Sequence, residues 1–271
     1  MLTQVTEAAT AIRGSDGTEI INGRLLAFKV EGSGSPSVIF ETGLGAESDE
    51  WEHVQRTVAQ HSGTFRYDRA GRGASDPARP GRDAYTMVDD LHELLHTVRV
   101  PVPYVLVGHS LGGLLTRVFA KRYPEEVAGM VLVDSMHEDQ FDVFGGAFPP
   151  PGPGDPPQLI GLRHFWTGGW KEFESTAERL NLPETVRQGR EVESLGDLPV
   201  HVITAGTFLN GPFVPPSERG RLQFKWEELQ AKFLRLSSRT KQSFVRDCGH
   251  FVQRERPEVI VQAILDIQRS A

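Results

Sequence analysis

The chain has 271 residues, a formal net charge of −7 and a sequence pI of about 5.7. The acidic balance and the absence of a long basic run argue against a nucleic-acid partner. A single cysteine, Cys248, excludes an internal disulfide and makes a cysteine-based zinc cluster implausible. No apolar run is long enough to cross a bilayer, and residues 1–16 lack the apolar centre of a signal peptide. We therefore expect a cytoplasmic protein without a membrane span.

Short apolar runs alternate with helix-like stretches along the chain. Residues 25–30 predict an edge strand, and 37–41 predict a buried strand that leads into Thr42-Gly43-Leu44-Gly45. Further strands are expected at 64–68, 104–107, 131–134, 199–204 and 242–246. Helices are expected at 85–98, from 111 to a stop at Pro124, and at 257–267. This order predicts an α/β fold, with a mostly parallel, doubly wound sheet.

Residues 135–197 interrupt this alternation. They contain the proline-rich run 148–157, which cannot form a regular element, followed by short aromatic-rich helical patterns. We expect an α/β core formed by residues 1–134 and 198–271, with 135–197 inserted as a cap over the carboxyl ends of the strands. Ligands of α/β sheets bind at those ends.

The run Gly108-His109-Ser110-Leu111-Gly112 carries the clearest chemical signal. It follows an expected strand and opens an expected helix, which is the setting of a nucleophile elbow. Side chains at the two flanking positions would collide with nearby backbone, so glycine is required there. The glycine patterns of dinucleotide and phosphate sites do not occur at this turn. Ser110 is therefore the expected nucleophile.

Four segments resemble α/β-hydrolase-fold serine hydrolases of the esterase and lipase type. They are the elbow at 108–113, the loop Thr42-Gly43-Leu44-Gly45, the turn at 68–75 with its D-x-x-G-x-G-x-S pattern, and Cys248-Gly249-His250-Phe251. In that family the last segment delivers the catalytic histidine. The resemblance covers about residues 20–134 and 198–270, and it implies an α/β-hydrolase fold. The serine-then-histidine order agrees with the family.

A serine hydroxyl needs a general base, and the base needs a third group to hold it. His250 is the expected base. His109 more plausibly packs in the turn, His137 lies near the expected pocket rim, and His201 lies inside a strand. His92 and His96 have the i,i+4 spacing of half a metal site, but the other half is missing from the pattern, so we favour a solvated helix face and expect no metal.

The acid of the triad has three candidates. In the family it usually follows the strand after the cap, but residues 207–246 contain no aspartate. Glu218 and Glu227 lie in that stretch. Asp134 ends the strand before the cap, and some members of the family take their acid from this position. We favour Asp134, and Glu218 and Glu227 remain alternatives.

Negative charge develops on the substrate oxygen during acyl transfer, and backbone N–H groups commonly stabilise it. The resemblance implies Leu44 and Leu111 as these donors. The expected pocket also includes loop, elbow and cap residues. These are Gly43, His109, Phe141, Phe144, Phe165, Trp166 and Trp170.

The sequence thus predicts a cofactor-free serine hydrolase that cleaves carboxylic esters of small, partly apolar substrates through an acyl-serine. The expected partner is the small-molecule substrate, and the oligomeric state is left open. Lactonase or amidase activity, cofactor-free haloperoxidase activity and carbon–carbon bond hydrolysis can use the same triad. A receptor that binds a small ligand and turns it over slowly is a further alternative.

Overall fold

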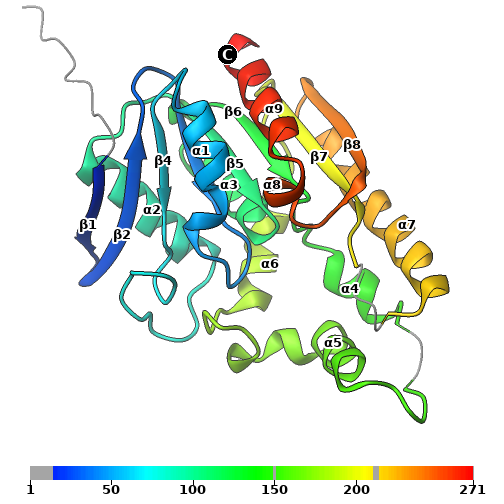
Figure 1. Ribbon diagram of the computed structural model, residues 1–271. Helices are drawn as coiled ribbons and strands as arrows, with labels where there is room; N and C mark the ends of the chain where they lie inside the picture. The colour runs from blue at the N-terminus through cyan, green and yellow to red at the C-terminus, as the bar shows by residue number, and fades with distance from the viewer. Residues whose placement is uncertain (1–14, 149–150, 210–213, 271) are drawn as a thin grey trace, which may run out of the picture.

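The computed structural model describes residues 15–148, 151–209 and 214–270. Pro149 and Pro150 of the proline-rich run, and residues 1–14 of the polar N-terminal segment, lie outside the described residues. The described chain forms one eight-stranded sheet with helices on both faces (Figure 1). It has the predicted α/β class.

The strands follow the order β1-β2-β4-β3-β5-β6-β7-β8 across the sheet. Their bounds are β1 (Ser15–Ile21), β2 (Arg24–Glu31), β3 (Ser37–Glu41), β4 (Thr64–Tyr67), β5 (Tyr104–His109), β6 (Val127–Val133), β7 (Val200–Thr207) and β8 (Thr240–Gly249). β2 runs antiparallel to both β1 and β4, and the strands from β4 to β8 are parallel. The mostly parallel sheet is therefore as predicted.

The edge-strand prediction for residues 25–30 was wrong. β2 lies between β1 and β4, and β1 forms the edge instead. β1 was missed because six of its seven residues are exposed or half-buried, so it has no apolar alternation. Its pairing with β2 comes from the tight turn at Asn22 and Gly23, which both have positive φ.

The helices cover both faces of the sheet. α1 and α9 lie on one face, and α2 and α3 lie on the other (Figure 1). Their bounds are α1 (Glu52–Val58), α2 (Ala84–Val98), α3 (Leu111–Arg122), α4 (Gln140–Gly145), α5 (Pro157–Thr167), α6 (Leu182–Arg190), α7 (Pro216–Lys232), α8 (Val252–Glu255) and α9 (Pro257–Ser270). Short 3-10 turns lie at η1 (Ser48–Trp51), η2 (Pro124–Glu126), η3 (Gly169–Lys171), η4 (Phe173–Ser175) and η5 (Phe233–Arg235).

The central strands are buried on both sides, which explains their continuous apolar runs. On β5, Val105 and Val107 pack in the cluster under α1 and α9, whereas Leu106 packs in the larger cluster with α2 and α3. Because successive side chains of a strand point to opposite faces, this one strand contributes to the hydrophobic cores on both sides of the sheet.

Residues 135–197 connect β6 to β7 and contain α4, α5 and α6. These helices lie beyond one end of the strands, with α5 farthest from the sheet (Figure 1). The division of the chain into a core and a cap at these residues stays a prediction.

Candidate active site

Ser110 lies on a sharp turn between β5 and α3. Its backbone has φ 50° and ψ −119°, a conformation that is costly for a residue with a side chain. A Cβ atom on Gly108 would lie 2.4 Å from the carbonyl oxygen of Gly112, and one on Gly112 would lie 2.3 Å from that of Glu41. The two glycines are therefore required by close backbone approach, as the sequence predicts.

His250 directly follows β8 and lies beside Asp134, which directly follows β6. Nδ1 of His250 is 2.6 Å from Oδ2 of Asp134. Since a carboxylate accepts hydrogen bonds, the proton of the neutral imidazole is on Nδ1. Nε2, on the opposite side of the ring, then carries no proton. An imidazole held in this way has an unprotonated nitrogen with which to accept a proton.

The second oxygen of Asp134 accepts two further hydrogen bonds. The amide of Ala205 donates to Oδ1 over 3.0 Å, and the indole Nε1 of Trp226 donates to it over 2.7 Å. The side chain of Asp134 is fully buried and its backbone has φ 41°. The carboxylate is thus fixed by groups from β7, α7 and the loop after β8. Among the residues that the structure describes, no lysine or arginine forms an ion pair with it, and these hydrogen bonds compensate its charge.

Glu218 and Glu227 have other partners. Glu218 accepts from Nε of Arg221 over 3.0 Å, and Glu227 accepts from Nε2 of Gln223 over 3.1 Å. Both belong to α7, the helix that contributes Trp226 to Asp134. Of the three acids, the structure places Asp134 on the imidazole of His250.

His109 supports the loop that carries His250. Its Nε2 donates to the backbone oxygen of His250 over 2.9 Å, and its Nδ1 accepts from Nε2 of Gln253 over 3.0 Å. Burial lowers the pKa of His109 below its usual value, although Glu50 opposes this, so the ring is neutral as the two bonds require. His109 is 1% exposed. It therefore lies behind the pocket, whereas we expected it in the lining.

The loop 42–45 is held near the elbow by two of its backbone amides. The amide of Gly43 donates to Glu50 over 3.3 Å, and that of Gly45 donates to Glu178 over 2.8 Å. Within the described residues, the amides of Leu44 and Leu111 have no protein acceptor. Both residues line the cavity that contains Ser110. Leu44 and Leu111 therefore stay the predicted oxyanion donors.

Arg69 holds this loop in place. Its guanidinium donates to the backbone oxygens of Thr42 and Gly43 over 2.8 and 2.6 Å, and it forms a bidentate pair with Glu178. It also pairs with Glu41. The guanidinium is 1% exposed and therefore dry. Arg69 thus joins β3, the loop 42–45 and Glu178 of the segment before α6.

In this buried group, the pKa values of Glu41 and Glu178 shift in opposite directions. Burial raises the pKa of Glu41, which also accepts a hydrogen bond from Tyr67 over 2.7 Å. Burial also disfavours the ionised form of Glu178, but Arg69 outweighs it and lowers the pKa of that carboxyl. Arg69 contacts both carboxyl groups and is the cation that opposes the cost of their burial.

A cavity of about 340 Å³ opens at the carboxyl ends of β5 and β6 and beneath α4 and α5. Its lining is mostly apolar, with four polar side chains. The apolar residues are Leu44, Leu111, Met136, Phe141, Leu162, Phe165, Trp166, Leu182, Phe208, Leu209 and Phe251, and the polar ones are Ser110, Gln140, His250 and Glu255. Cavities of this size and character bind small ligands.

The aromatic residues expected in the pocket divide into two groups. Phe141, Phe165 and Trp166 belong to the lining. Phe144 is fully buried against Trp166, and Trp170 stacks on Phe141 with ring centroids 4.1 Å apart. These two rings, from α4 and η3, form a layer behind the lining, because α5 packs against both of these elements.

Two further expectations differ from the structure. A Cβ on Gly43 would lie 2.9 Å from Nδ1 of His109, so Gly43 packs against the elbow and is not part of the cavity lining. His137 is 4% exposed, packs on Phe233 and does not belong to the cavity lining.

Sequence reasoning missed Trp226, Glu178 and Gln253. Trp226 and Glu178 contact the site from elements far away in the sequence. Gln253 lies three residues after His250 but acts on His109, at the end of β5. Arg69 was noted only as part of its turn. Asp68 is the residue that holds the turn at 68–75 together, since its carboxylate accepts hydrogen bonds from the amides of Ser48 and Ala74 over 2.8 and 3.1 Å.

Residues 38–263 match the alpha/beta hydrolase family, and the chain belongs to it. The uncharacterized protein YqjL of Bacillus subtilis (strain 168) is 26% identical over 239 residues, which cover 88% of this chain and 85% of that protein. A putative carbamate hydrolase, RutD, of Yersinia enterocolitica is 31% identical over 112 residues, which cover 40% of each chain.

Solved structures share the fold. Cfl2 from Burkholderia cenocepacia superposes with a TM-score of 0.68 at 18% identity and covers 95% of this chain and 96% of that one. A thermophilic esterase from Thermogutta terrifontis gives a TM-score of 0.64 at 19% identity over 94% and 98% of the two chains. At such identities the likeness concerns the fold alone. Family membership supports a hydrolase.

Across residues 15–148, 151–209 and 214–270, no helix combines the length and apolar character that crossing a bilayer requires.

Proposed function

We propose that this protein hydrolyses carboxylic esters of small, partly apolar substrates through an acyl-serine intermediate. The observation that carries the proposal is the 2.6 Å contact between Oδ2 of Asp134 and Nδ1 of His250. His250 lines the same cavity as Ser110. A carboxylate, an imidazole and a hydroxyl on a strained turn form the set needed to activate a serine.

In the first half of the reaction, Oγ of Ser110 attacks the ester carbonyl while Nε2 of His250 accepts the hydroxyl proton. Asp134 stabilises the imidazolium that forms and keeps the ring oriented. The amides of Leu44 and Leu111 donate to the carbonyl oxygen as it becomes negative. Collapse of the tetrahedral intermediate expels the alcohol, which takes the proton from His250.

In the second half, His250 removes a proton from water, and the resulting hydroxide attacks the acyl-serine. A second tetrahedral intermediate forms at the same amides. As it collapses, the bond between the acyl carbon and Oγ breaks, His250 returns the proton to Oγ of Ser110, and the acid is released. These steps use only side chains, backbone amides and water.

The cavity supports small substrates with an apolar part. Its volume of about 340 Å³ is near the lower end of ligand pockets, and most of its lining is apolar. We therefore expect short-chain p-nitrophenyl esters to be better substrates than long-chain ones. Matched lactones and anilides, assayed beside them, would rank the bond types.

The test is covalent labelling with a fluorophosphonate, followed by peptide mapping. We expect modification of Ser110, and we expect Ser110→Ala to lose both labelling and ester turnover while keeping its thermal transition. Ser33→Ala, at an exposed serine outside the cavity, is the matched control. Labelling at another serine, or full turnover by Ser110→Ala, would refute the proposal.

A further inference from the structure

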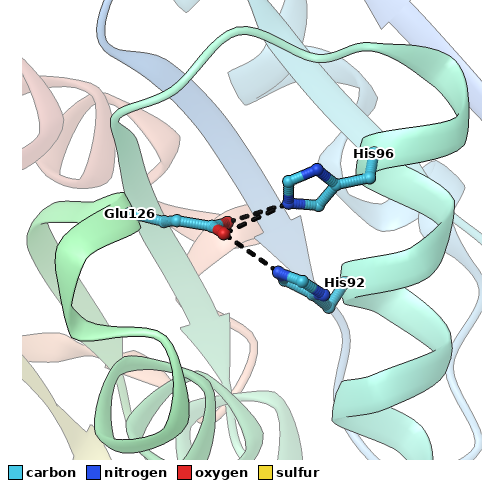
Figure 2. A group of neighbouring side chains, drawn as sticks. All are labelled: His92, His96 and Glu126. Atoms are coloured by element: carbon cyan, nitrogen blue, oxygen red, sulfur yellow. Dashed lines mark hydrogen bonds and ion pairs between the residues drawn. The ribbon is translucent and has the colours of Figure 1, made fainter.

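A second cluster of chemically active side chains lies away from the cavity. His92 and His96 are one turn apart on α2, and Glu126 ends η2 directly before β6. Figure 2 shows the two imidazoles and the carboxylate pointing toward one another. Nε2 of His92 and Nε2 of His96 lie 3.0 and 3.1 Å from Oε1 of Glu126, and the three ligand atoms all lie within 4.8 Å of one another.

These separations are close to those of ligands around a zinc ion. Zinc binds imidazole nitrogen and carboxylate oxygen at about 2.0–2.2 Å, so neighbouring ligands of a tetrahedral site lie about 3.3–3.5 Å apart. The observed nitrogen–oxygen distances are a few tenths of an ångström shorter. A small rotation of the Glu126 side chain would therefore open the position for an ion.

The ligands are held by the fold before any ion binds. The ring of His92 stacks on Tyr123, with centroids 3.7 Å apart and an interplanar angle of 5°. The hydroxyl of Tyr123 in turn donates to Asp89 over 2.8 Å. The helical spacing of His92 and His96 places both on one side of α2. Packing of this kind orients a ligand in advance.

The chemistry of the set favours a borderline transition metal. Two neutral imidazoles and one carboxylate suit Zn²⁺, whereas Mg²⁺ and Ca²⁺ prefer oxygen ligands. The side chains of His92 and Glu126 are 24% and 23% exposed, and that of His96 is 52% exposed. Water can therefore reach the remaining coordination positions.

We propose that His92, His96 and Glu126 form a Zn²⁺ site that joins α2 to the turn before β6. Glu126 precedes the amino end of β6, whereas Asp134 follows its carboxyl end. A seven-residue strand spans about 23 Å. The ion would thus act on stability, far from the reacting groups, and this proposal does not depend on the proposed hydrolysis.

The test uses full-length protein without a histidine tag, treated with a chelator and dialysed. Calorimetric titration with ZnCl₂ should show one site per chain, and zinc should raise the thermal transition while an equal concentration of MgCl₂ leaves it unchanged. Co²⁺ in place of Zn²⁺ should give visible absorption bands of a low-coordinate site.

His96→Gln and Glu126→Gln should each weaken zinc binding by at least about tenfold. Both positions are partly exposed, and glutamine can still form hydrogen bonds, so the metal-free variants should fold with wild-type circular dichroism. His61→Gln, at an exposed histidine elsewhere, is the matched control and should bind zinc as the wild type does. Ester turnover should be unchanged in all three variants.

Two results would overturn the proposal. If His96→Gln and Glu126→Gln bind zinc as tightly as the wild type, the ion binds elsewhere. If the wild type takes up no zinc from micromolar ZnCl₂, the cluster is only a pair of hydrogen bonds from imidazole N–H groups to a carboxylate.

Discussion

Oδ2 of Asp134 lies 2.6 Å from Nδ1 of His250, although 116 residues separate the two in the chain. The contact arises because β6 and β8 flank β7 in a parallel arrangement, so their carboxyl ends meet at one edge of the sheet. Asp134 is buried and His250 is partly exposed, its side chain 19% accessible. The acid is therefore held inside the protein, and the imidazole faces the cavity.

Asp134→Asn should lower kcat for p-nitrophenyl acetate by about 10⁴-fold, because an amide in this position favours the wrong imidazole tautomer. Glu218→Gln and Glu227→Gln are the matched controls and should retain wild-type turnover within about twofold, since both residues are bound elsewhere on α7. Steady-state kinetics of the three variants provides the measurement. Losses of equal size in all three would assign the acid elsewhere.

Trp226→Phe should lower kcat by about tenfold with little change in KM, because Asp134 loses a charge-assisted hydrogen bond of about 1.5–3 kcal/mol. Phenylalanine keeps the stacking on Phe208, whose ring centroid lies 3.8 Å away.

Trp170→Phe is the control for Trp226→Phe. Trp170 stacks on Phe141 and is not bonded to Asp134. Trp170→Phe should retain the wild-type kcat within about twofold, as measured by steady-state kinetics beside Trp226→Phe. A wild-type kcat for Trp226→Phe would show that the indole N–H has only a packing role.

Arg69→Ala should lower the free energy of unfolding by about 3–5 kcal/mol, because it leaves the buried carboxyls of Glu41 and Glu178 without their cation. Arg69→Lys should recover only part of this loss, since an ammonium cannot reproduce the planar set of donors. Urea unfolding measures both. Arg72→Ala, in the same turn but at a half-exposed ion pair with Glu47, should change stability by at most about 1 kcal/mol. Equal effects at positions 69 and 72 would contradict the role of Arg69.

The stability of the protein should decrease as the pH falls from 6.5 to 4. Burial lowers the pKa of His137 from 6.5 to about 4, and its Nδ1 accepts from the amide of Asp139 over 3.0 Å. In this range the unfolded chain binds more protons than the folded one, so stability rises with pH. A full proton of difference changes the free energy of unfolding by about 1.4 kcal/mol per pH unit.

His137→Gln should reduce that pH dependence, and the exposed His61→Gln should not. Urea unfolding at several pH values between 4 and 6.5 measures the slopes. His201, whose pKa burial also lowers to about 4, keeps part of the dependence in both variants. A slope for His137→Gln equal to that of the wild type would mean that His137 titrates normally.

Much of the fold could be predicted because the central strands are buried on both faces. Burial produces short apolar runs such as residues 104–107. In the sequence these runs are easily distinguished from the helical spacing of apolar residues in α2. β1 and α1 were missed because an exposed edge strand and a two-turn helix carry little pattern of their own.

What the sequence by itself determined is local. The elbow at Ser110 and the glycines beside it follow from backbone sterics within a few residues, and the position of His250 follows from a short motif before the last helix. The choice of Asp134 as the partner of His250, the indole of Trp226 behind it, and the closure of Glu126 onto His92 and His96 were decided only by the tertiary structure. Each of these contacts joins segments that are far apart in the sequence. Strand order and helix packing bring them together, and local sequence patterns do not specify these distances.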